Sequence, residues 1–150
     1  MSGELDKVDR NIIAALGRDG RLSMADLALK VGLSKTPVQA RVRRLERDGF
    51  IKGYQAVIDR AKMGEGHIAF VQVKLSDTTS GALDAFNKAA REVREIEQCH
   101  MMAASFDYLL KVRTTDIAAY RRALGEKIAA LPHVAQTSTF VVMETVRDSS

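Results

Sequence analysis

The sequence predicts an α+β protein in which a winged helix-turn-helix is followed by a ferredoxin-like βαββαβ domain. Short helical segments separated by turn signals fill the first third of the chain. Positive charge is concentrated in the same part: residues 1–60 carry twelve Lys and Arg against eight Asp and Glu, whereas residues 61–150 carry eleven of each. Segments in the order strand, helix, strand, strand, helix, strand then follow. The expected domains are residues 1–53 and 65–150, joined by residues 54–64.

Composition bounds the environment of the protein. The chain has 150 residues, 46% of them hydrophobic, which is typical of a folded globular protein. No apolar run approaches the roughly 20 residues needed to cross a bilayer, and the N-terminus lacks the apolar core of a signal peptide. The single cysteine, Cys99, cannot form an internal disulfide framework. We therefore expect a cytoplasmic protein with no membrane partner.

Two short helices open the chain. Asp6 is expected to cap the first, which ends near Gly17 or Gly20. Ser23 begins the second, and Gly32 ends it. A short turn containing glycine between two helices is typical of a helix-turn-helix.

The third helix is basic and has two distinct faces. Ser34 is its expected N-cap, so Pro37 lies in the first turn, where its missing N–H has no helical partner to lose. At 100° per residue, one stripe comprises Val38, Val42 and Leu45, and the opposite face comprises Thr36, Gln39, Ala40, Arg43 and Arg47. A basic helix alone is usually a solvated surface. Together with the caps, the glycine turn, the localised charge and a predicted hairpin around Lys52 and Gly53, it indicates binding to double-stranded DNA.

The side chains of this helix suggest separate roles in DNA binding. Gln39 can form two hydrogen bonds with adenine and Arg43 two with guanine, while the small Ala40 lets the backbone approach closely. Arg41 and Arg44 flank this face and suit phosphates better than bases. The predicted DNA-binding residues are Ser34, Lys35, Thr36, Pro37, Gln39, Ala40, Arg41, Arg43, Arg44, Arg47 and Lys52.

Periodicity in the rest of the chain predicts an antiparallel sheet with helices on one face. The expected strands are residues 66–76, 96–105, 107–114 and 134–146, and the expected helices are residues 80–93 and 116–131. Many outer as well as inner residues of the first and last strands are apolar. A second copy packed on the open face would cover them, so we expect a homodimer.

Catalysis is not expected. His67, His100 and His133 are scattered, and none stands at metal-ligand spacing. Cys99 and His100 are neighbours on a predicted strand and therefore point to opposite faces. No glycine loop that could hold a phosphate is present, so we predict no enzyme, no metal and no cofactor.

The stretch around residues 103–108 is the most ligand-like. Small residues at 103–105 leave backbone N–H groups accessible to a carboxylate, Asp107 could hold an ammonium, and the rings of Phe106 and Tyr108 could wall a pocket. The alternative is a tight hairpin whose aspartate satisfies its own backbone. The residues alone favour neither interpretation.

Four segments of the sequence resemble the Lrp/AsnC family of prokaryotic transcription factors. They are "LDKVDRNIIAAL", "SKTPVQARVRRLERDGFIKGYQAVID", "CHMMAASFDYLLKV" and "TSTFVVMETVRD", and together they extend over essentially the whole chain. The resemblance implies a linker strand through Tyr54–Asp59, dimerisation through the sheet, further assembly into tetramers or octamers, and an amino-acid effector bound between dimers.

Carried over by motif, the resemblance also implies an effector site. Ala104 stands where the family usually has glycine, and Ser105 where an acidic residue is common. This region looks most like the proline-catabolism activators, so proline is a candidate effector, with leucine as another. The implied site residues are Met101, Ala103, Ala104, Ser105, Phe106, Asp107, Tyr108, Gln136, Thr137 and Thr139.

Two functions from different classes follow. The first is a sequence-specific regulator of amino-acid metabolism whose assembly or DNA affinity responds to a small amino acid. The second is an architectural oligomer that wraps DNA with little sequence preference and binds no effector.

Overall fold

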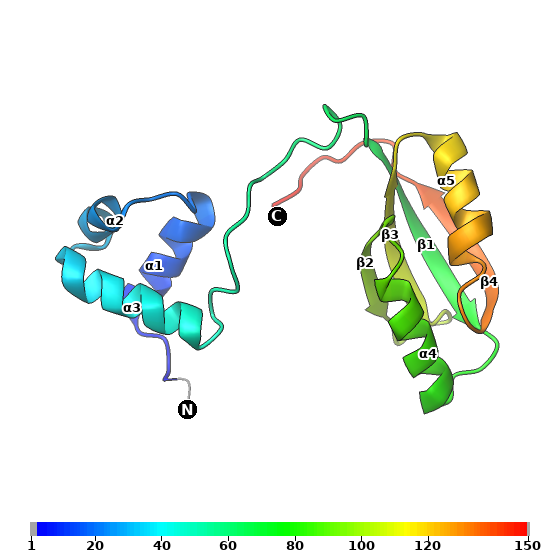
Figure 1. Cartoon of the computed structure of the whole chain (residues 1–150), viewed down its shortest axis with the longest axis horizontal. Coiled ribbons are helices and arrows are strands. Elements are labelled where there is room, and N and C mark those ends of the chain that lie inside the picture. The colour runs from blue at the N-terminus through cyan, green and yellow to red at the C-terminus, as the bar shows by residue number, and fades with distance from the viewer. Residues whose placement is uncertain (1–2, 150) are drawn as a thin grey trace. The chain divides into compact units, whose positions relative to one another are not determined.

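The computed structural model describes residues 3–149. The chain divides into two compact units, residues 1–57 and residues 58–150. Each unit has its own hydrophobic core, and Figure 1 shows the elements of both. Across the part of the chain that the structure describes, no helix has both the length and the apolar character required to span a membrane.

The first unit consists of three helices with well-defined ends. They are α1 (Lys7–Arg18), α2 (Met24–Val31) and α3 (Lys35–Arg47). Asp6 caps α1, and the Ser23 hydroxyl accepts the Asp26 N–H at the start of α2. Gly32 ends α2 in the left-handed conformation, with φ 74°, which glycine adopts without steric cost. The predicted caps and helix-turn-helix are thus confirmed, and Val38, Val42 and Leu45 are buried as expected.

The predicted hairpin around Lys52 and Gly53 is wrong. Residues 52–59 form neither helix nor strand, so the expected linker strand through Tyr54–Asp59 is also absent from the single chain. The chain leaves α3 through Gly49, which has φ 81°, and the Ile51 N–H bonds back to the Leu45 carbonyl. Two short β-prone runs without a third strand or a packed face are marginal in water, so local propensity did not suffice here.

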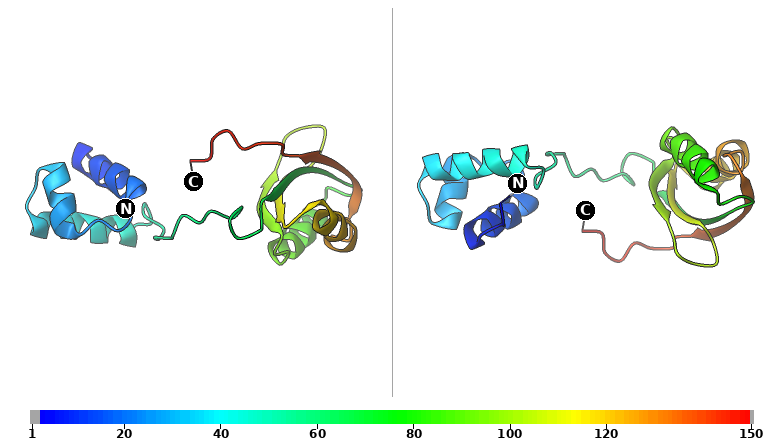
Figure 2. Two further views of the ribbon diagram at one scale, coloured as in Figure 1. Left: turned by 90° about the horizontal axis from the view of Figure 1, so that it is seen from above. Right: turned by 90° about the horizontal axis from the view of Figure 1, so that it is seen from below.

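The second unit is a four-stranded antiparallel sheet with the strand order β2-β3-β1-β4. Helices α4 and α5 lie on the same face of this sheet (Figure 2), and their apolar side chains pack on Ala69, Val71 and Val73. The predicted ferredoxin-like order is confirmed. The elements are β1 (His67–Leu75), α4 (Ser80–Arg91), β2 (Ile96–Met101), β3 (Tyr108–Thr114), α5 (Ile117–Ala123), the π-helical turn η1 (Leu124–Ile128) and β4 (Val134–Val141).

Several elements are shorter than predicted. The strand expected at 96–105 ends at Met101, and the strand expected at 134–146 ends at Val141. The strand at 96–101 stops where its partner begins, because Met101 pairs with Tyr108, the first residue of β3. The last pair of β4, Val141 with Ala69, lies two residues from the start of β1. The helix expected at 116–131 widens into η1, where the Ala129 N–H reaches the Leu124 carbonyl at 2.8 Å.

The face of the sheet opposite the helices is open in the single chain. Residues Ile68 and Phe70 on β1, Leu109 on β3 and Phe140 on β4 face this side, by the strand register. Phe140 is 53% exposed. Polar side chains such as Gln72 and Lys111 lie between them, so the face is mixed, with an apolar centre.

Candidate functional site

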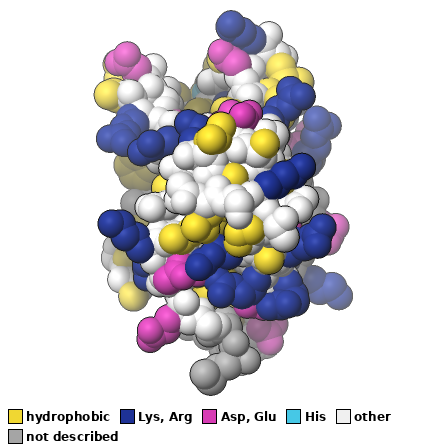
Figure 3. Space-filling model, turned by 90° about the vertical axis from the view of Figure 1, so that its left-hand side faces the viewer, with side chains coloured by type: hydrophobic (Ala, Val, Ile, Leu, Met, Phe, Trp, Pro, Cys, Tyr) yellow, Lys and Arg dark blue, Asp and Glu magenta, His cyan; other side chains and the backbone are white. Residues whose placement is uncertain are grey.

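The outward face of α3 is accessible, as the sequence predicts for a DNA reader. Lys35, Thr36, Ala40 and Arg43 are exposed, and Gln39 is half-buried. Figure 3 shows Lys and Arg side chains at many places on the surface that is turned toward the viewer. Ser34 occupies the N-cap position, but its side chain makes no capping hydrogen bond. Within residues 3–149, Arg43 makes no ion pair with a carboxylate.

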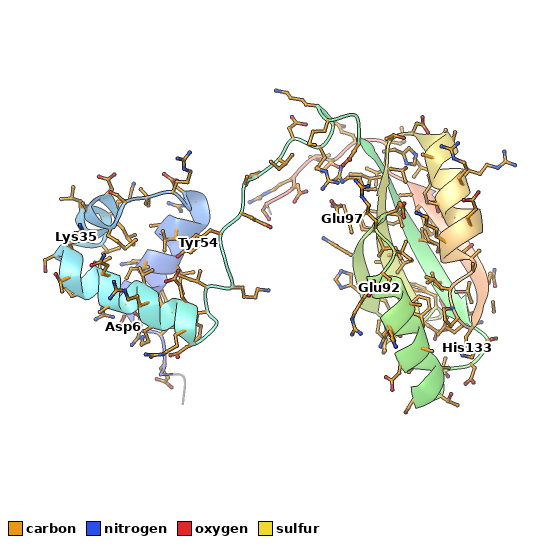
Figure 4. The ribbon with its side chains drawn as sticks, in the orientation of Figure 1. Asp6, Lys35, Tyr54, Glu92, Glu97 and His133 are labelled. Carbon is orange, nitrogen blue, oxygen red and sulfur yellow. The ribbon has the colours of Figure 1, made fainter. Side chains whose placement is uncertain are left out.

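Arg41 and Arg44 are placed differently from Arg43. Arg41 donates to Asp6 at 2.6 Å and to Asp9 at 3.0 Å, and Arg44 donates to Asp9. Asp6 lies beside α3 in Figure 4. Asp9 is only 1% exposed and also belongs to the capping box of α1, in which its carboxylate accepts the Asp6 N–H at 3.2 Å. We call these four residues the Asp9 cluster.

The charges of the Asp9 cluster stabilise one another. The Asp9 N–H holds the pKa of the Asp6 carboxyl below its usual value, and the Arg41 guanidinium adds to this effect. The hydrogen bonds to Asp6 and then Asp9 raise the pKa of Arg41. Both groups therefore keep their charge through the neutral range.

Asp9 is absent from the predicted functional residues, although the sequence contains a signal for it. Asp9 stands three residues before Ile12 and seven before Leu16, both of which are buried. This spacing puts an acidic side chain on the apolar stripe of α1. A buried carboxylate needs cationic partners, and the arginine-rich α3 is the evident source of them.

The predicted effector loop is anchored to the sheet by Asp107. Its carboxylate accepts the Leu75 N–H at 2.7 Å, and its own N–H donates to the Val73 carbonyl at 2.9 Å. Its carbonyl accepts the Met102 N–H at 2.9 Å, which closes the loop. Asp107 thus bonds to backbone groups of β1. This arrangement is closer to the interpretation of a tight hairpin, in which the aspartate satisfies backbone groups, than to a carboxylate that is free to hold an ammonium. Ala103, Ala104 and Ser105 are exposed and Phe106 is half-buried.

Tyr108 lies in the core instead of walling an open pocket. It is 1% exposed, its ring centroid is 4.2 Å from that of Phe86, and its hydroxyl donates to Asn87 at 2.5 Å. Its edge still borders a small cavity of about 250 Å³ between α4 and β2, which Met101 also lines. The cavity is bounded by Asn87, Ala90, Arg91, Cys99, Met101 and Tyr108.

The β4 part of the predicted effector site is divided between two faces. Thr137 and Thr139 pair with Val73 and Val71, on the helix-covered face, and the Thr139 hydroxyl is hydrogen-bonded to that of Tyr120 at 2.5 Å. Gln136 pairs with Lys74 on the open face. Since β1 separates β3 from β4, roughly 10 Å of sheet lies between β4 and the loop at Tyr108. One chain does not bring the two halves together.

A larger, charged cavity of about 410 Å³ lies at the other end of the sheet. In Figure 4, Glu97 marks the end of the sheet that holds this cavity, and His133 marks the opposite end. Glu97 accepts from Arg113 at 3.0 Å and lies 3.2 Å from Lys111. Burial opposes ionisation of Glu97, but these two cations hold its pKa below the usual value.

The geometry offers little to catalysis. Among residues 3–149, no three His, Cys, Asp or Glu side chains are grouped as metal ligands would be. Cys99 pairs with Leu110 and His100 with Leu109, so the two side chains face opposite sides of β2, as predicted. Burial raises the pKa of the Cys99 thiol, which disfavours the reactive thiolate.

Comparison with known proteins gives matches over both units. Residues 5–52 match a family model described as winged helix-turn-helix DNA-binding, and residues 68–150 match one described as the Lrp/AsnC ligand binding domain. A proline dehydrogenase transcriptional activator from Rhizobium radiobacter is 56% identical over 97% of this chain and 94% of its own length. The leucine-responsive regulatory protein of Escherichia coli K12 is 45% identical over 98% of this chain and 90% of its own length.

Solved structures agree with these matches. A transcriptional regulator from Neisseria meningitidis in complex with L-Met superposes with a TM-score of 0.91 at 26% identity, over 97% of this chain and 94% of the other. An AsnC family transcriptional regulator from Agrobacterium tumefaciens superposes with a TM-score of 0.91 at 33% identity, over 96% of this chain and 94% of the other. These relatives are transcriptional regulators, not enzymes, as the sequence predicts.

Proposed function

Because the chain belongs to the Lrp/AsnC family, and is therefore a DNA-binding transcriptional regulator with a ligand-binding domain, we propose which residues perform each task. Helix α3 reads the major groove, with Gln39 and Arg43 on base edges. Lys35, Arg47 and Lys52 hold phosphates, and Ser34, Thr36, Pro37 and Ala40 form the close-approach surface at the start of the helix. The exposure of Arg43, which has no ion-pair partner among residues 3–149, is the observation that carries this assignment.

The regulator acts as a homodimer joined through the open faces of two sheets, with assembly into tetramers or octamers. The apolar centre of that face, at Ile68, Phe70, Leu109 and Phe140, supports this, because an uncovered patch of this kind is typical of an interface. Two copies of α3 related by a twofold axis then meet successive major grooves of a palindromic site. Phe140→Glu should give a monomer on light scattering, and an unchanged mass would contradict this interface.

The effector is a small amino acid bound near residues 101–108. The exposed backbone at Ala103–Ser105 suits a carboxylate, and the adjoining cavity at Met101 and Tyr108 suits an apolar side chain. Residues Gln136–Thr139 complete the site from another copy, since one chain keeps them apart. The relatives named for proline dehydrogenase activation and for leucine response make proline and leucine the first candidates, and the protein acts in the cytoplasm, with the DNA.

The effector proposal is tested by a thermal-shift screen of the full chain against the amino acids. A ligand that binds only the folded state raises the melting temperature with concentration. We expect proline or leucine to do so in the wild type and to lose the effect in Met101→Glu, which fills the cavity with charge. No shift from any amino acid would contradict the proposal.

The DNA proposal is tested by selecting a binding sequence from random duplexes and footprinting it. One bounded palindromic site is expected of a sequence-specific regulator, whereas phased protection over many helical turns would favour the architectural alternative. Arg43→Ala should weaken the selected site by roughly tenfold or more, and should weaken random DNA far less. Equal losses on both kinds of DNA would overturn the role of Arg43 in base reading.

A further inference from the structure

The Asp9 cluster joins the cap of α1 to the recognition helix. The Asp9 carboxylate accepts from Arg41 at 3.0 Å, from the Asp6 N–H at 3.2 Å and from Arg44. With 1% of its surface exposed, it has little access to water, and these three donors satisfy both of its oxygens. The carboxylate therefore depends on its two arginines for compensation of a buried charge.

The four arginines of α3 form two pairs with different surroundings. Arg41 and Arg44 are three residues apart and lie on one side of the helix, with side chains only 30% and 37% exposed. Arg43 and Arg47 are four residues apart on another side, where Arg43 is exposed and the Arg47 side chain is 72% exposed. Arg47 is engaged only by its neighbour Asp48, at 3.2 Å on the surface, among the residues that the structure describes.

The two pairs differ in what DNA binding would cost them. Arg43 can pair with a phosphate without losing another ion-pair partner within the described part of the chain. Arg47 can exchange its surface pair with Asp48 for a phosphate at little cost in free energy, because exposed ion pairs are weak. If Arg41 and Arg44 turned to the DNA, the Asp9 carboxylate would stay buried without a cationic partner, which is far more unfavourable. A solvated phosphate offers no comparable gain, so the cluster should stay intact when DNA binds.

We propose that Asp9 is a positioning residue for DNA recognition: it retains Arg41 and Arg44 within the protein and sets α3 on α1, so that Arg43 and Arg47 are the arginines of this helix that meet DNA. This inference rests on the proposed DNA-binding face of α3. It removes Arg41 and Arg44 from the predicted phosphate contacts and gives a functional role to Asp9, which lies outside the reading helix.

The salt dependence of DNA binding separates the two pairs of arginines. Each phosphate contact contributes about 0.9 to the slope of log K against log salt concentration. The informative protein is the full-length triple variant Asp9→Leu, Arg41→Met, Arg44→Met, in which apolar groups replace the buried carboxylate and both arginines. Asp6 stays, because its side chain is 52% exposed and remains solvated. We expect it to keep the wild-type slope and to bind the selected duplex within about threefold of wild type.

The matched control is Arg43→Met with Arg47→Met, two arginines of the same helix. Its slope should fall by about 0.9 for each phosphate that the helix no longer neutralises, and its affinity by more than about tenfold. If this control changed nothing, the proposed DNA face would fail. If the control behaved as expected but the folded triple variant showed the same fall in slope, the inference about Asp9 alone would be overturned.

Positioning has a signature that a purely structural role lacks. Asp9→Asn removes the charge that holds the two arginines, so we expect the ratio of specific to random DNA binding to fall several-fold while the salt slope does not decrease. Loss of folded protein alone would leave this ratio unchanged, and that result would contradict positioning. Restoration of the ratio in the triple variant would support it.

A measurement on the wild type avoids any question of folding. Phenylglyoxal modifies accessible arginines, and mass spectrometry locates the modified sites. In the free protein, Arg41 and Arg44 should react several-fold more slowly than Arg43 and Arg47, and DNA should protect only the latter pair. Equal reactivity of all four in the free protein, with protection of all four by DNA, would overturn the proposal.

Discussion

Asp9 in the DNA-binding unit and Glu97 in the ligand-binding unit are both carboxylates among basic side chains. Asp9 has two arginine partners and is 1% exposed. Glu97 has Lys111, Arg113 and the more distant Arg60 around it, but its side chain is 30% exposed. Glu97 has more cationic partners, but Asp9 should contribute more to the free energy of unfolding because it is buried. Water screens the ion pairs of Glu97, whereas it cannot replace those of Asp9.

The contrast teaches that burial and existing contacts decide what a functional-looking residue can do. Arg41 and Arg44 have the same chemistry as Arg43, but their guanidinium groups already have partners. Asp107 likewise has the chemistry of an ammonium receptor, but its carboxylate already holds the Leu75 N–H. Substitutions at these and similar residues test this rule.

The largest effect is expected from removing the buried carboxylate. Asp9→Ala leaves Arg44 without its carboxylate partner and Arg41 with Asp6 alone, and it breaks the capping box of α1. The free energy of unfolding of the first unit should therefore fall by about 3 kcal/mol. The matched variant Glu97→Ala should cost less than about 1 kcal/mol in the second unit. Urea unfolding followed by far-UV circular dichroism measures both, and equal losses would break the comparison.

A smaller loss is expected at the effector loop. Asp107→Ala leaves the Leu75 N–H without its acceptor and should destabilise the second unit by about 2 kcal/mol, whereas Asp107→Asn keeps an acceptor oxygen and should cost less. Thermal unfolding with and without the effector separates this role from ligand binding. If Asp107→Asn abolished the ligand-induced shift without lowering the melting temperature, Asp107 would be an ammonium receptor after all.

Two serines at helix starts provide a comparison of identical residues. The Ser23 hydroxyl accepts the Asp26 N–H at 3.1 Å, so Ser23→Ala should cost about 1 kcal/mol of unfolding free energy. The Ser34 side chain makes no capping bond, and Ser34→Ala should cost only about 0.3 kcal/mol. Urea denaturation curves of the two variants decide the point, and reversal of the order would contradict the assigned caps.

The smallest effect is a pH dependence from Asp6. Its folded pKa lies below the usual value of 3.8, so its ionised form stabilises the folded state at pH values above 3.8. That contribution is lost as the pH falls through the lower folded pKa. The difference in melting temperature between wild type and Asp6→Asn should therefore be constant above about pH 5 and shrink below about pH 4. A difference that grew on acidification would have the wrong sign.

Local signals predicted the first unit well. Helix α1 begins at the cap Asp6, and α2 begins after Ser23 and ends at Gly32, all through contacts within a few residues. The buried stripe of α3 follows from helical periodicity. The Asp9 cluster was missed because it joins positions up to 35 residues apart, and no local pattern specifies which arginine turns inward.

In the second unit, the order of elements followed from the sequence but their extents did not. A strand end can depend on where the partner strand begins, as at Met101, which lies opposite the first residue of β3. The face on which a β4 residue lies depends on register, so Thr139 could not be recognised as a partner of Tyr120 from the sequence. The prediction of a hairpin at Lys52 is wrong because β-prone residues form a stable strand only when a neighbouring strand or face packs against them.

The stretch of chain without helix or strand at residues 52–59 has a consequence for how DNA sites are engaged. Eight residues reach at most about 29 Å when fully extended. In the proposed dimer, such tethers let one DNA-binding unit search for its half-site while the other is already bound, at an effective concentration in the millimolar range. Shortening the tether should therefore narrow the range of half-site separations that one dimer accepts, whereas the affinity of a single unit for a single half-site should stay the same.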